Sequence, residues 1–344
     1  MFPEVPMRIV LAAALLLALG AQPAKAQAPL AVYCSVVQDW CTLMTQEFEK
    51  KTAIKVSLVQ KGSGETLAQL RAEKTNPKAD IWWGGTGDPH LAAAEEDLTE
   101  PYQSPMLAKL NDWARRQAEQ SKFRTVGIYA GALGFAYNTE ILAKKKLAAP
   151  ACWKDLTKPE YRDEIQISNP SSSGTAYTAV ATLVQVFGEE PAFDYLKQLH
   201  KNVNQYTRSG PAPARGTARG ETTIGVMFLH DAVAEAVDGF PVKVVSPCEG
   251  TGYEIGSMSL VKGSKNLEAA KRWYDFALTA EAQALGARAK SYQTPSNPDA
   301  PIPEKAPKLS EMKLIAYDFV RYGGADERKR LIARWEKEVG SLPK

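Results

Sequence analysis

Histidine and cysteine are scarce in this sequence, which contains three histidines and four cysteines among 344 residues. No C-x-x-C pair occurs and no histidine stands near a cysteine, so the ligand spacing of a structural zinc site is missing. The sequence also lacks a G-x-x-x-x-G-K-[ST] phosphate loop and a G-x-S-x-G nucleophile elbow. These absences argue against a zinc protein, a nucleotide hydrolase and a serine hydrolase of the α/β type.

Long apolar runs are missing too, apart from one near the N-terminus. Residues 9–19 form an apolar run of about eleven residues, whereas a membrane-spanning helix needs about twenty. Arg8 precedes this run and the A-K-A triplet at 24–26 follows it, which is the order of a secretory signal peptide. We predict a signal peptide over residues 1–26, cleavage after Ala26 and an exported, soluble mature protein. The residue directly after the cleavage position is Gln27 and not the cysteine of a lipoprotein, so we expect no lipid anchor.

An excess of charge of one sign is also absent. The sequence has 42 basic and 39 acidic residues and a net charge of +3. A balance this small and this mixed does not favour nucleic acid or a polybasic membrane anchor. We therefore expect neither as a partner.

The few cysteines that occur all follow the predicted cleavage position. An even number in an exported protein suggests disulfides, and four cysteines allow three connectivities. The spacing of Cys34 and Cys41 fits a small local loop, and Cys152 would then pair with Cys248 across distant sequence. Buried free thiols are the alternative.

Strand and helix patterns alternate along the mature chain. Residues 30–36, 54–60 and 79–85 read as strands, with helical periodicity at 40–52 and 62–74. This β-α-β-α-β order predicts a parallel sheet with right-handed crossovers. A long run of β-forming and small residues at 123–142 then leads into a second set of alternating elements.

We therefore predict two α/β lobes, each with a central, mostly parallel sheet flanked by helices, joined by a hinge of two crossover strands. The expected boundaries are 27–128 for the first part of lobe one, 129–253 for lobe two and 254–300 for the return to lobe one. Residues 301–344 should form C-terminal helices, and the pattern does not say which lobe they join. In open α/β sheets, ligands bind where strands end and helices begin.

Several of these strand–helix junctions are rich in glycine and hydroxyl groups. Helix N-termini offer unpaired N–H groups and the positive end of the helix dipole, and hydroxyls add neutral donors, so such junctions suit phosphate or carboxylate groups. The alternative is that these residues only cap helices and form turns. The candidates for anion binding are Ser35, Ser63, Thr86, Ser173, Gly174, Thr175 and Ser209.

A different chemistry appears in "FLHDA", where His230 and Asp231 stand between a strand and a helix. Asp231 could simply cap the helix; alternatively, both side chains hydrogen-bond ligand hydroxyls, because carboxylates accept and a neutral imidazole both donates and accepts. The loop "PCEGTGYE" adds Glu249 and Glu254 after another strand. Trp82, Trp83 and Tyr206 are candidates to cover an apolar sugar face, although Trp82 and Trp83 point to opposite sides of one strand.

Several segments together resemble one family. "GSGETLAQLRAEKTNPKADIWWGGTGDPH", "GVMFLHDAVAE" and "PCEGTGYEIGSMSLVKGSKN" are similar to periplasmic solute-binding proteins of bacterial ABC importers with the type II fold. Within that family the chain resembles the iron(III)-binding-like group, and "FLHDA" with "PCEGTGYEIG" points to its sugar-phosphate-binding branch.

The resemblance implies a ligand, a place and a partner. His230, Asp231 and either Glu249 or Glu254 would hold a sugar, and the hydroxyl-rich loops would hold its phosphate. The protein would be a monomeric periplasmic receptor without enzyme activity, cofactor or metal. Its partner would be a transporter permease, with a sensor kinase as a second candidate.

Two other functions remain as alternatives. Ferric-binding relatives usually present a tyrosine pair, but this sequence has no Tyr-Tyr dipeptide, and Thr207 follows Tyr206. A phosphonate or another organic phosphate is a further possible ligand. A metal-dependent phosphohydrolase would need more histidine ligands than His90 and His200 could add to His230.

Overall fold

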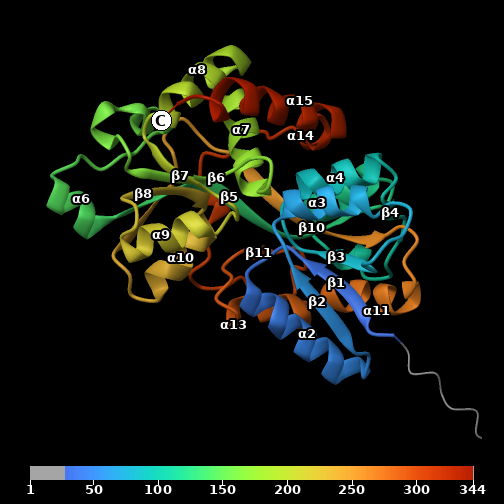
Figure 1. The fold of residues 1–344 in the computed structure, drawn as a ribbon. Helices are drawn as coiled ribbons and strands as arrows, with labels where there is room; N and C mark the ends of the chain where they lie inside the picture. Colours follow the sequence, from blue (N-terminus) through green and yellow to red (C-terminus); the bar gives the residue numbers. More distant parts are fainter. Residues whose placement is uncertain (1–27, 344) are drawn as a thin grey trace, which may run out of the picture.

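The computed structural model describes residues 28–343, and the predicted signal peptide lies outside them. The described chain forms two α/β lobes that share one sheet with the strand order β2-β1-β3-β10-β5-β8-β6-β7 (Figure 1). Strands β5 (Val126–Asn138) and β10 (Tyr253–Val261) are antiparallel neighbours in its middle. The first half of β5 pairs with β10 and the second half pairs with β8 and β9, so this strand passes from one lobe into the other.

Lobe one contains a parallel group of strands, because β1 pairs with both β2 and β3 in the same direction. The antiparallel strand β10 continues the sheet beside β3. Helices cover both faces. The elements are β1 (Leu30–Cys34), α2 (Gln38–Thr52), β2 (Val56–Gln60), α3 (Ser63–Ala72), β3 (Ile81–Trp83), α4 (Gly87–Glu95), β4 (Thr99–Glu100), a 3₁₀ turn (Leu107–Lys109) and α5 (Asp112–Gln120). After β10 follow α11 (Leu267–Ala277), α12 (Ala280–Gln283), α13 (Leu285–Arg288) and β11 (Thr294–Pro295).

Lobe two repeats this plan, with β6 parallel to β7 and β8 and the antiparallel β5 beside β8. The predicted fold class is therefore confirmed. The elements are α6 (Thr139–Lys145), 3₁₀ turns at Trp153–Thr157 and Pro159–Tyr161, β6 (Ile165–Ser168), α7 (Gly174–Phe187), α8 (Glu189–His200), β7 (Val203–Thr207), α9 (Ala212–Arg219), β8 (Ile224–Phe228), α10 (Leu229–Val237) and β9 (Val242–Val245). The C-terminal elements are a 3₁₀ turn (Leu309–Glu311), α14 (Phe319–Gly323), α15 (Ala325–Trp335) and a π-helical turn (Glu336–Gly340).

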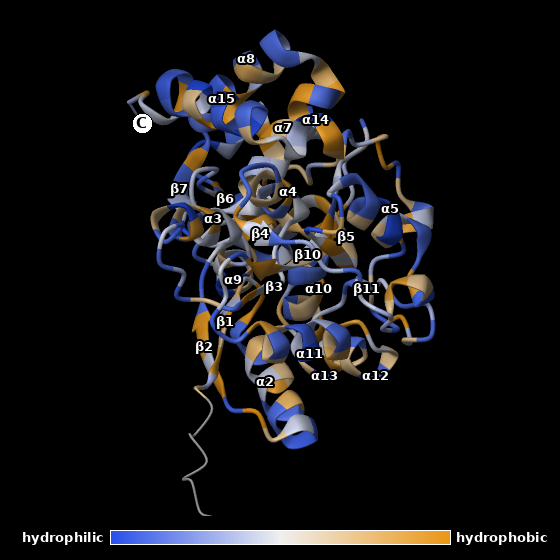
Figure 2. Cartoon of the chain, turned by 90° about the vertical axis from the view of Figure 1, so that its right-hand side faces the viewer, coloured by the Kyte–Doolittle hydropathy of each residue, from blue (hydrophilic) through white to orange (hydrophobic). Residues whose placement is uncertain are grey.

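The apolar residues of the surface helices explain why each lobe folds around its own core. In α2 the buried residues Trp40, Met44 and Phe48 recur every four positions and face the sheet of lobe one. Figure 2 shows hydrophilic and hydrophobic residues mixed along the same helices, as in α2 and α15. None of the helices within residues 28–343 is long and apolar enough to span a membrane.

The C-terminal helices join the core of lobe two. Tyr322, Leu331 and Trp335 pack with the residues of that core, and α14 and α15 also lie against α4 of lobe one. The C-terminal segment therefore bridges the two lobes on the side of α4.

Two disulfides form, and both have the predicted pairing. Cys34 is bonded to Cys41 and Cys152 to Cys248, which accounts for all four cysteines. The first links the end of β1 to the start of α2. The second links the turn at Trp153–Thr157 to the segment before β10.

Candidate ligand-binding site

A cavity of about 560 Å³ lies between the lobes where six helices begin. Lobe one contributes the starts of α2, α3 and α4, and lobe two contributes those of α7, α9 and α10. The carboxyl ends of parallel strands meet at one edge of a sheet, so strand–helix junctions distant in sequence come together here. The structure places all of the predicted anion-binding and hydroxyl-binding residues in the lining of this cavity except Glu249.

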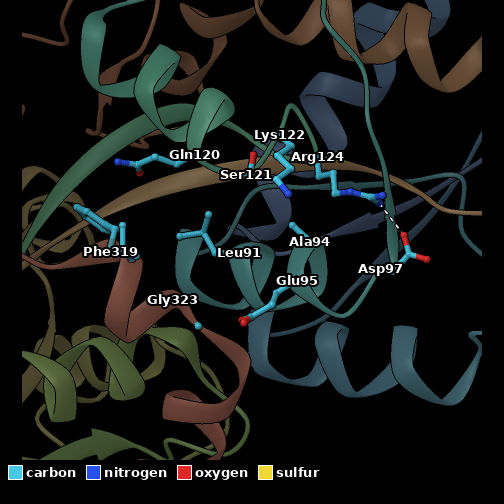
Figure 3. A pocket seen from close by; sticks show the side chains of 12 residues that line it. Leu91, Ala94, Glu95, Asp97, Gln120, Ser121, Lys122, Arg124, Phe319 and Gly323 are labelled. Atoms are coloured by element: carbon cyan, nitrogen blue, oxygen red, sulfur yellow. Dashed lines mark ion pairs between the residues drawn. The ribbon is translucent and has the colours of Figure 1, made fainter.

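A second hollow of about 490 Å³ lies between α4, the segment at 120–124 and α14 (Figure 3). Its lining includes the apolar side chains of Leu91 and Phe319, and its Arg124 already forms an ion pair with Asp97 at 2.9 Å. This groove contains none of the predicted site residues. The cavity between the lobes is therefore the better candidate for a small polar ligand.

Lobe one provides the hydroxyl-rich wall of the cavity. Ser63 is the first residue of α3 and Thr86 directly precedes α4, and their hydroxyl oxygens lie 3.2 Å apart. Ser35 follows β1, and its hydroxyl oxygen lies 3.1 Å from Thr66 Oγ1. The Thr86 side chain makes no capping hydrogen bond to its own helix, so helix capping does not explain the hydroxyl at this position.

The facing wall in lobe two is the start of α7. Ser173 caps this helix by accepting a hydrogen bond from the Ala176 N–H at 3.4 Å, as the capping alternative anticipated. Gly174 and Thr175 follow in its first turn. Ser209, which precedes α9, completes this wall. The two walls together direct helix N-termini and hydroxyl groups into one space, which is the chemistry of an anion site.

The cavity lining also contains a histidine and two acids, His230, Asp231 and Glu254. His230 Nε2 lies 3.7 Å from Asp231 Oδ1 and 3.8 Å from Glu254 Oε1, too far for strong hydrogen bonds. His230 Nδ1 is buried without a hydrogen-bond partner among the described residues, and Gly131 leaves the space that this ring occupies. The three side chains therefore face the cavity with unused hydrogen-bonding capacity.

Burial sets the protonation of this group. It lowers the pKa of the His230 imidazole to about 3, so the ring is neutral at pH 7. Burial raises the pKa of Asp231 to about 7, against the opposing charge of Arg215. Burial and the neighbouring Asp231 raise the pKa of Glu254 well above its usual value. Protonated carboxyl groups and a neutral imidazole both donate and accept, which suits ligand hydroxyls.

Glu249 lies outside this cavity. Its carboxylate accepts hydrogen bonds from the backbone N–H groups of Trp153 at 2.7 Å and Lys154 at 3.0 Å. Within residues 28–343, its carboxylate and the sulfurs of Cys152 and Cys248 form the one cluster with metal-ligand spacing, and the disulfide occupies both sulfurs. Of the two glutamates that the sequence left open, the structure brings Glu254 into the cavity.

The prediction that Trp82, Trp83 and Tyr206 cover a ligand was wrong. Both tryptophans are buried, because helices cover both faces of β3. Tyr206 packs against Trp335 in the core of lobe two. The aromatic residues that line the cavity are Tyr129 and Phe228.

Sequence reasoning missed several polar residues of the cavity. Arg215 in the first turn of α9 lines it, and its charge opposes the rise in the pKa of Asp231. Arg215 lies about one helical turn beyond the Ser209–Gly210 junction, and this position could have identified it as a cavity residue from the sequence. Lys61, Gln38 and Gln293 also line the cavity. Gln293 lies far from every strand–helix junction, so no local pattern points to it.

The lobes contact one another around the cavity. The Glu65 N–H donates to the Ser172 carbonyl at 3.2 Å, and Glu65 also forms an ion pair with Arg208. Thr178 of lobe two donates to the carboxylate of Asp88 of lobe one at 3.0 Å. The structure is therefore a closed arrangement with the candidate site between the lobes.

Two lobes on a shared sheet, with a polar cavity between them, define a solute-binding protein. The chain belongs to the bacterial extracellular solute-binding protein family, whose model matches residues 76–322. This confirms the resemblance seen in the sequence.

Close relatives cover nearly the whole chain. An uncharacterized protein from Haemophilus influenzae is 48% identical over 318 residues, 92% of each chain. The solved periplasmic binding protein AfuA from Actinobacillus pleuropneumoniae, with exogenous fructose-6-phosphate bound, is 47% identical with a TM-score of 0.89, and the match covers 91% of this chain and 99% of AfuA. The solved periplasmic binding protein P5PA is 40% identical with a TM-score of 0.88, and the match covers 90% of this chain and 99% of P5PA.

Proposed function

We propose that this protein is a periplasmic receptor that captures a sugar phosphate and delivers it to the permease of an ABC importer. The observation that carries the proposal is that two chemically different groups line one cavity. Helix N-termini with their hydroxyls form one group, and His230, Asp231 and Glu254 form the other. A ligand with an anionic group and several hydroxyls matches both groups, and the likeness to AfuA supports this ligand class.

The phosphate binds at the N-termini of α3, α4 and α7 in this proposal. Ser35, Ser63, Thr86, Ser173, Thr175 and Ser209 donate to its oxygens together with backbone N–H groups, Gly174 among them. Closure about the β5–β10 hinge brings the two walls together and excludes water, which strengthens each charge–dipole contact. The closed receptor then presents both lobes to its membrane partner. A sensor kinase is the alternative partner, and the receptor acts as a monomer.

The tyrosine chemistry of the cavity supports this ligand over ferric iron. Tyr129 is the one tyrosine among the described residues that line the cavity, and its hydroxyl accepts a hydrogen bond from the Gly85 N–H at 3.1 Å. Burial and Glu254 raise the pKa of its hydroxyl well above the usual value. A phenolate ligand for iron is therefore costly at this position.

Titration calorimetry tests the proposal. We expect fructose 6-phosphate or glucose 6-phosphate to bind much more tightly than fructose, inorganic phosphate, ferric citrate and 2-aminoethylphosphonate. Incubation with glucose 6-phosphate should release no phosphate, because the proposal includes no catalysis. Tight binding of ferric citrate or a phosphonate with no response to sugar phosphates would overturn it.

A further inference from the structure

Trp82 is fully buried in lobe one, yet its indole reaches the wall of the cavity. The indole Nε1–H donates a hydrogen bond to Ser35 Oγ at 2.9 Å. Ser35 lies in the cavity lining, and Trp82 does not. The other partner of the Ser35 hydroxyl is Thr66 Oγ1 at 3.1 Å. Ser35 therefore connects a buried indole to the cavity.

The donors and acceptors around Ser35 Oγ limit where its proton can point. The indole nitrogen can only donate, so it occupies a lone pair of Ser35 Oγ. The Thr66 hydroxyl has a single proton, which goes either to the Gly62 carbonyl at 3.1 Å or to Ser35 Oγ. In the first case the Ser35 proton points to Thr66 Oγ1 or into the cavity. In the second case both lone pairs of Ser35 Oγ are occupied, and its proton points into the cavity.

A second buried ring holds Trp82 in place. His90 stacks on the indole with ring centroids 3.5 Å apart and planes 18° from parallel. Its Nε2 lies 3.1 Å from the Gly84 carbonyl and its Nδ1 lies 2.8 Å from Ser259 Oγ. Because the carbonyl can only accept, Nε2 carries the proton and the imidazole is held from both sides. His90 thus supports both Trp82 and the glycine turn that precedes Thr86.

The backbone of Ser35 is also fixed. Its N–H donates to the Trp83 carbonyl at 3.0 Å, and the disulfide between Cys34 and Cys41 encloses the segment at 35–40. With the backbone fixed, the hydrogen bonds to Trp82 and Thr66 hold the Ser35 oxygen in its place.

We propose that Trp82 is a positioning residue that makes Ser35 a hydrogen-bond donor toward a bound anion. The inference rests on the proposed function, since it assigns the phosphate to the hydroxyl-bearing helix N-termini beside Ser35. Phosphate oxygens only accept, so a serine whose lone pair is already occupied is oriented before the ligand arrives. Without the indole N–H, Ser35 can also present a lone pair to the phosphate, which repels it.

A double-mutant cycle tests this role against a merely structural one. Trp82→Phe keeps an aromatic ring and removes the N–H, and we expect its affinity for fructose 6-phosphate to fall about three- to tenfold, the effect of one hydrogen bond. Ser35→Ala should also weaken binding. In the Ser35→Ala background, Trp82→Phe should have no further effect, because Trp82 acts through Ser35.

Trp83 supplies the matched control. It is the next residue on the same strand, it is buried in the core, and its indole nitrogen lacks a hydrogen-bond partner within the part of the chain that the structure describes. Trp83→Phe should therefore leave the affinity unchanged even where it lowers the melting temperature. If Trp82→Phe does not fold, replacing Trp82 with β-(3-benzothienyl)alanine removes the N–H and keeps the size of the ring.

The outcomes separate the two proposals. Failure of the wild-type protein to bind a sugar phosphate would count against the proposed function. If the wild type binds normally but Trp82→Phe causes the same loss of affinity with and without the Ser35→Ala substitution, the positioning role is overturned. An equal loss from Trp83→Phe would do the same.

Discussion

Gly174 of lobe two approaches Thr86 of lobe one so closely that a Cβ atom on Gly174 would lie 1.9 Å from Thr86 Oγ1. The same atom would lie 2.4 Å from Ser63 Oγ. Real Cβ contacts are essentially never this short, so a larger residue at position 174 fits the closed arrangement only if these hydroxyls or the lobes move apart. Because Gly174 begins α7, its backbone can reach the hydroxyls of the other lobe directly.

Gly174→Ala should therefore prevent full closure. We expect the affinity for fructose 6-phosphate to fall by at least about tenfold, because the added methyl group separates the two walls that share the phosphate. Small-angle X-ray scattering should show that excess ligand compacts the wild-type protein but not the variant. An alanine variant that binds and compacts like the wild type would contradict this account of closure.

The two glutamates near the second disulfide provide a matched pair. Glu254→Gln changes a group at the cavity and should weaken binding of fructose 6-phosphate much more than binding of inorganic phosphate. Glu249→Gln weakens two backbone hydrogen bonds outside the cavity, so it should lower the free energy of unfolding by about 1 kcal/mol and leave affinity unchanged. Calorimetry and thermal unfolding of both variants check this. A loss of affinity in the Glu249 variant alone would reverse the assignment.

Stability should depend on pH through Asp231. Burial raises its pKa in the folded state to about 7, whereas an unfolded aspartate has a pKa of 3.8. The folded state therefore binds more protons between these values, and this contribution to stability is lost as the pH rises from about 4 to about 7. Asp231→Asn removes the effect.

Asp231→Asn should thus become more stable relative to the wild type across this window, by up to about 4 kcal/mol. The comparison of the two proteins cancels the opposite contribution of His230, whose pKa is lowered and which favours the folded state as the pH rises. Urea unfolding of ligand-free protein at pH 4, 5.5 and 7.5 measures the difference. A constant difference at all three values would contradict the raised pKa.

The two disulfides should affect stability and binding in opposite order. Cys152 and Cys248 are 96 residues apart, and chain entropy attributes about 5 kcal/mol to a loop of that length. Cys34 and Cys41 are seven residues apart, which corresponds to about 2.5 kcal/mol, but their loop lines the cavity.

Cys152→Ala/Cys248→Ala should therefore lose more stability, and Cys34→Ala/Cys41→Ala should lose more affinity. Unfolding curves and calorimetry of both double variants test this crossing pattern. If the same double variant shows the larger loss of both stability and affinity, the account of the short disulfide as the bond that holds the binding loop is contradicted.

Most of the candidate site followed from sequence because it depends on local signals. Glycine and hydroxyl residues at strand–helix junctions mark their own positions, and a parallel sheet brings such junctions to one edge. Local sequence signals could not decide which of Glu249 and Glu254 enters the cavity. The choice depends on where β10 begins, at Tyr253, which directs one glutamate into the cavity and leaves the other on a turn of lobe two.

Other features depended on contacts between distant residues. Trp82 and Trp83 point to opposite sides of β3, and both are buried because β3 is covered on both faces. The C-terminal helices were visible as periodic segments, yet only the packing of Trp335 into the core of lobe two shows where they belong. Arg215 and Gln293 enter the cavity through tertiary structure, for which a single sequence gives little signal.

A crystal structure with fructose 6-phosphate tests the central claim most directly. We predict the phosphate at the starts of α3, α4 and α7, beside Ser63, Thr86 and Gly174, and the sugar hydroxyls at Asp231 and Glu254. A ligand in the reverse orientation, or one bound in the groove between α4 and α14, would contradict the account.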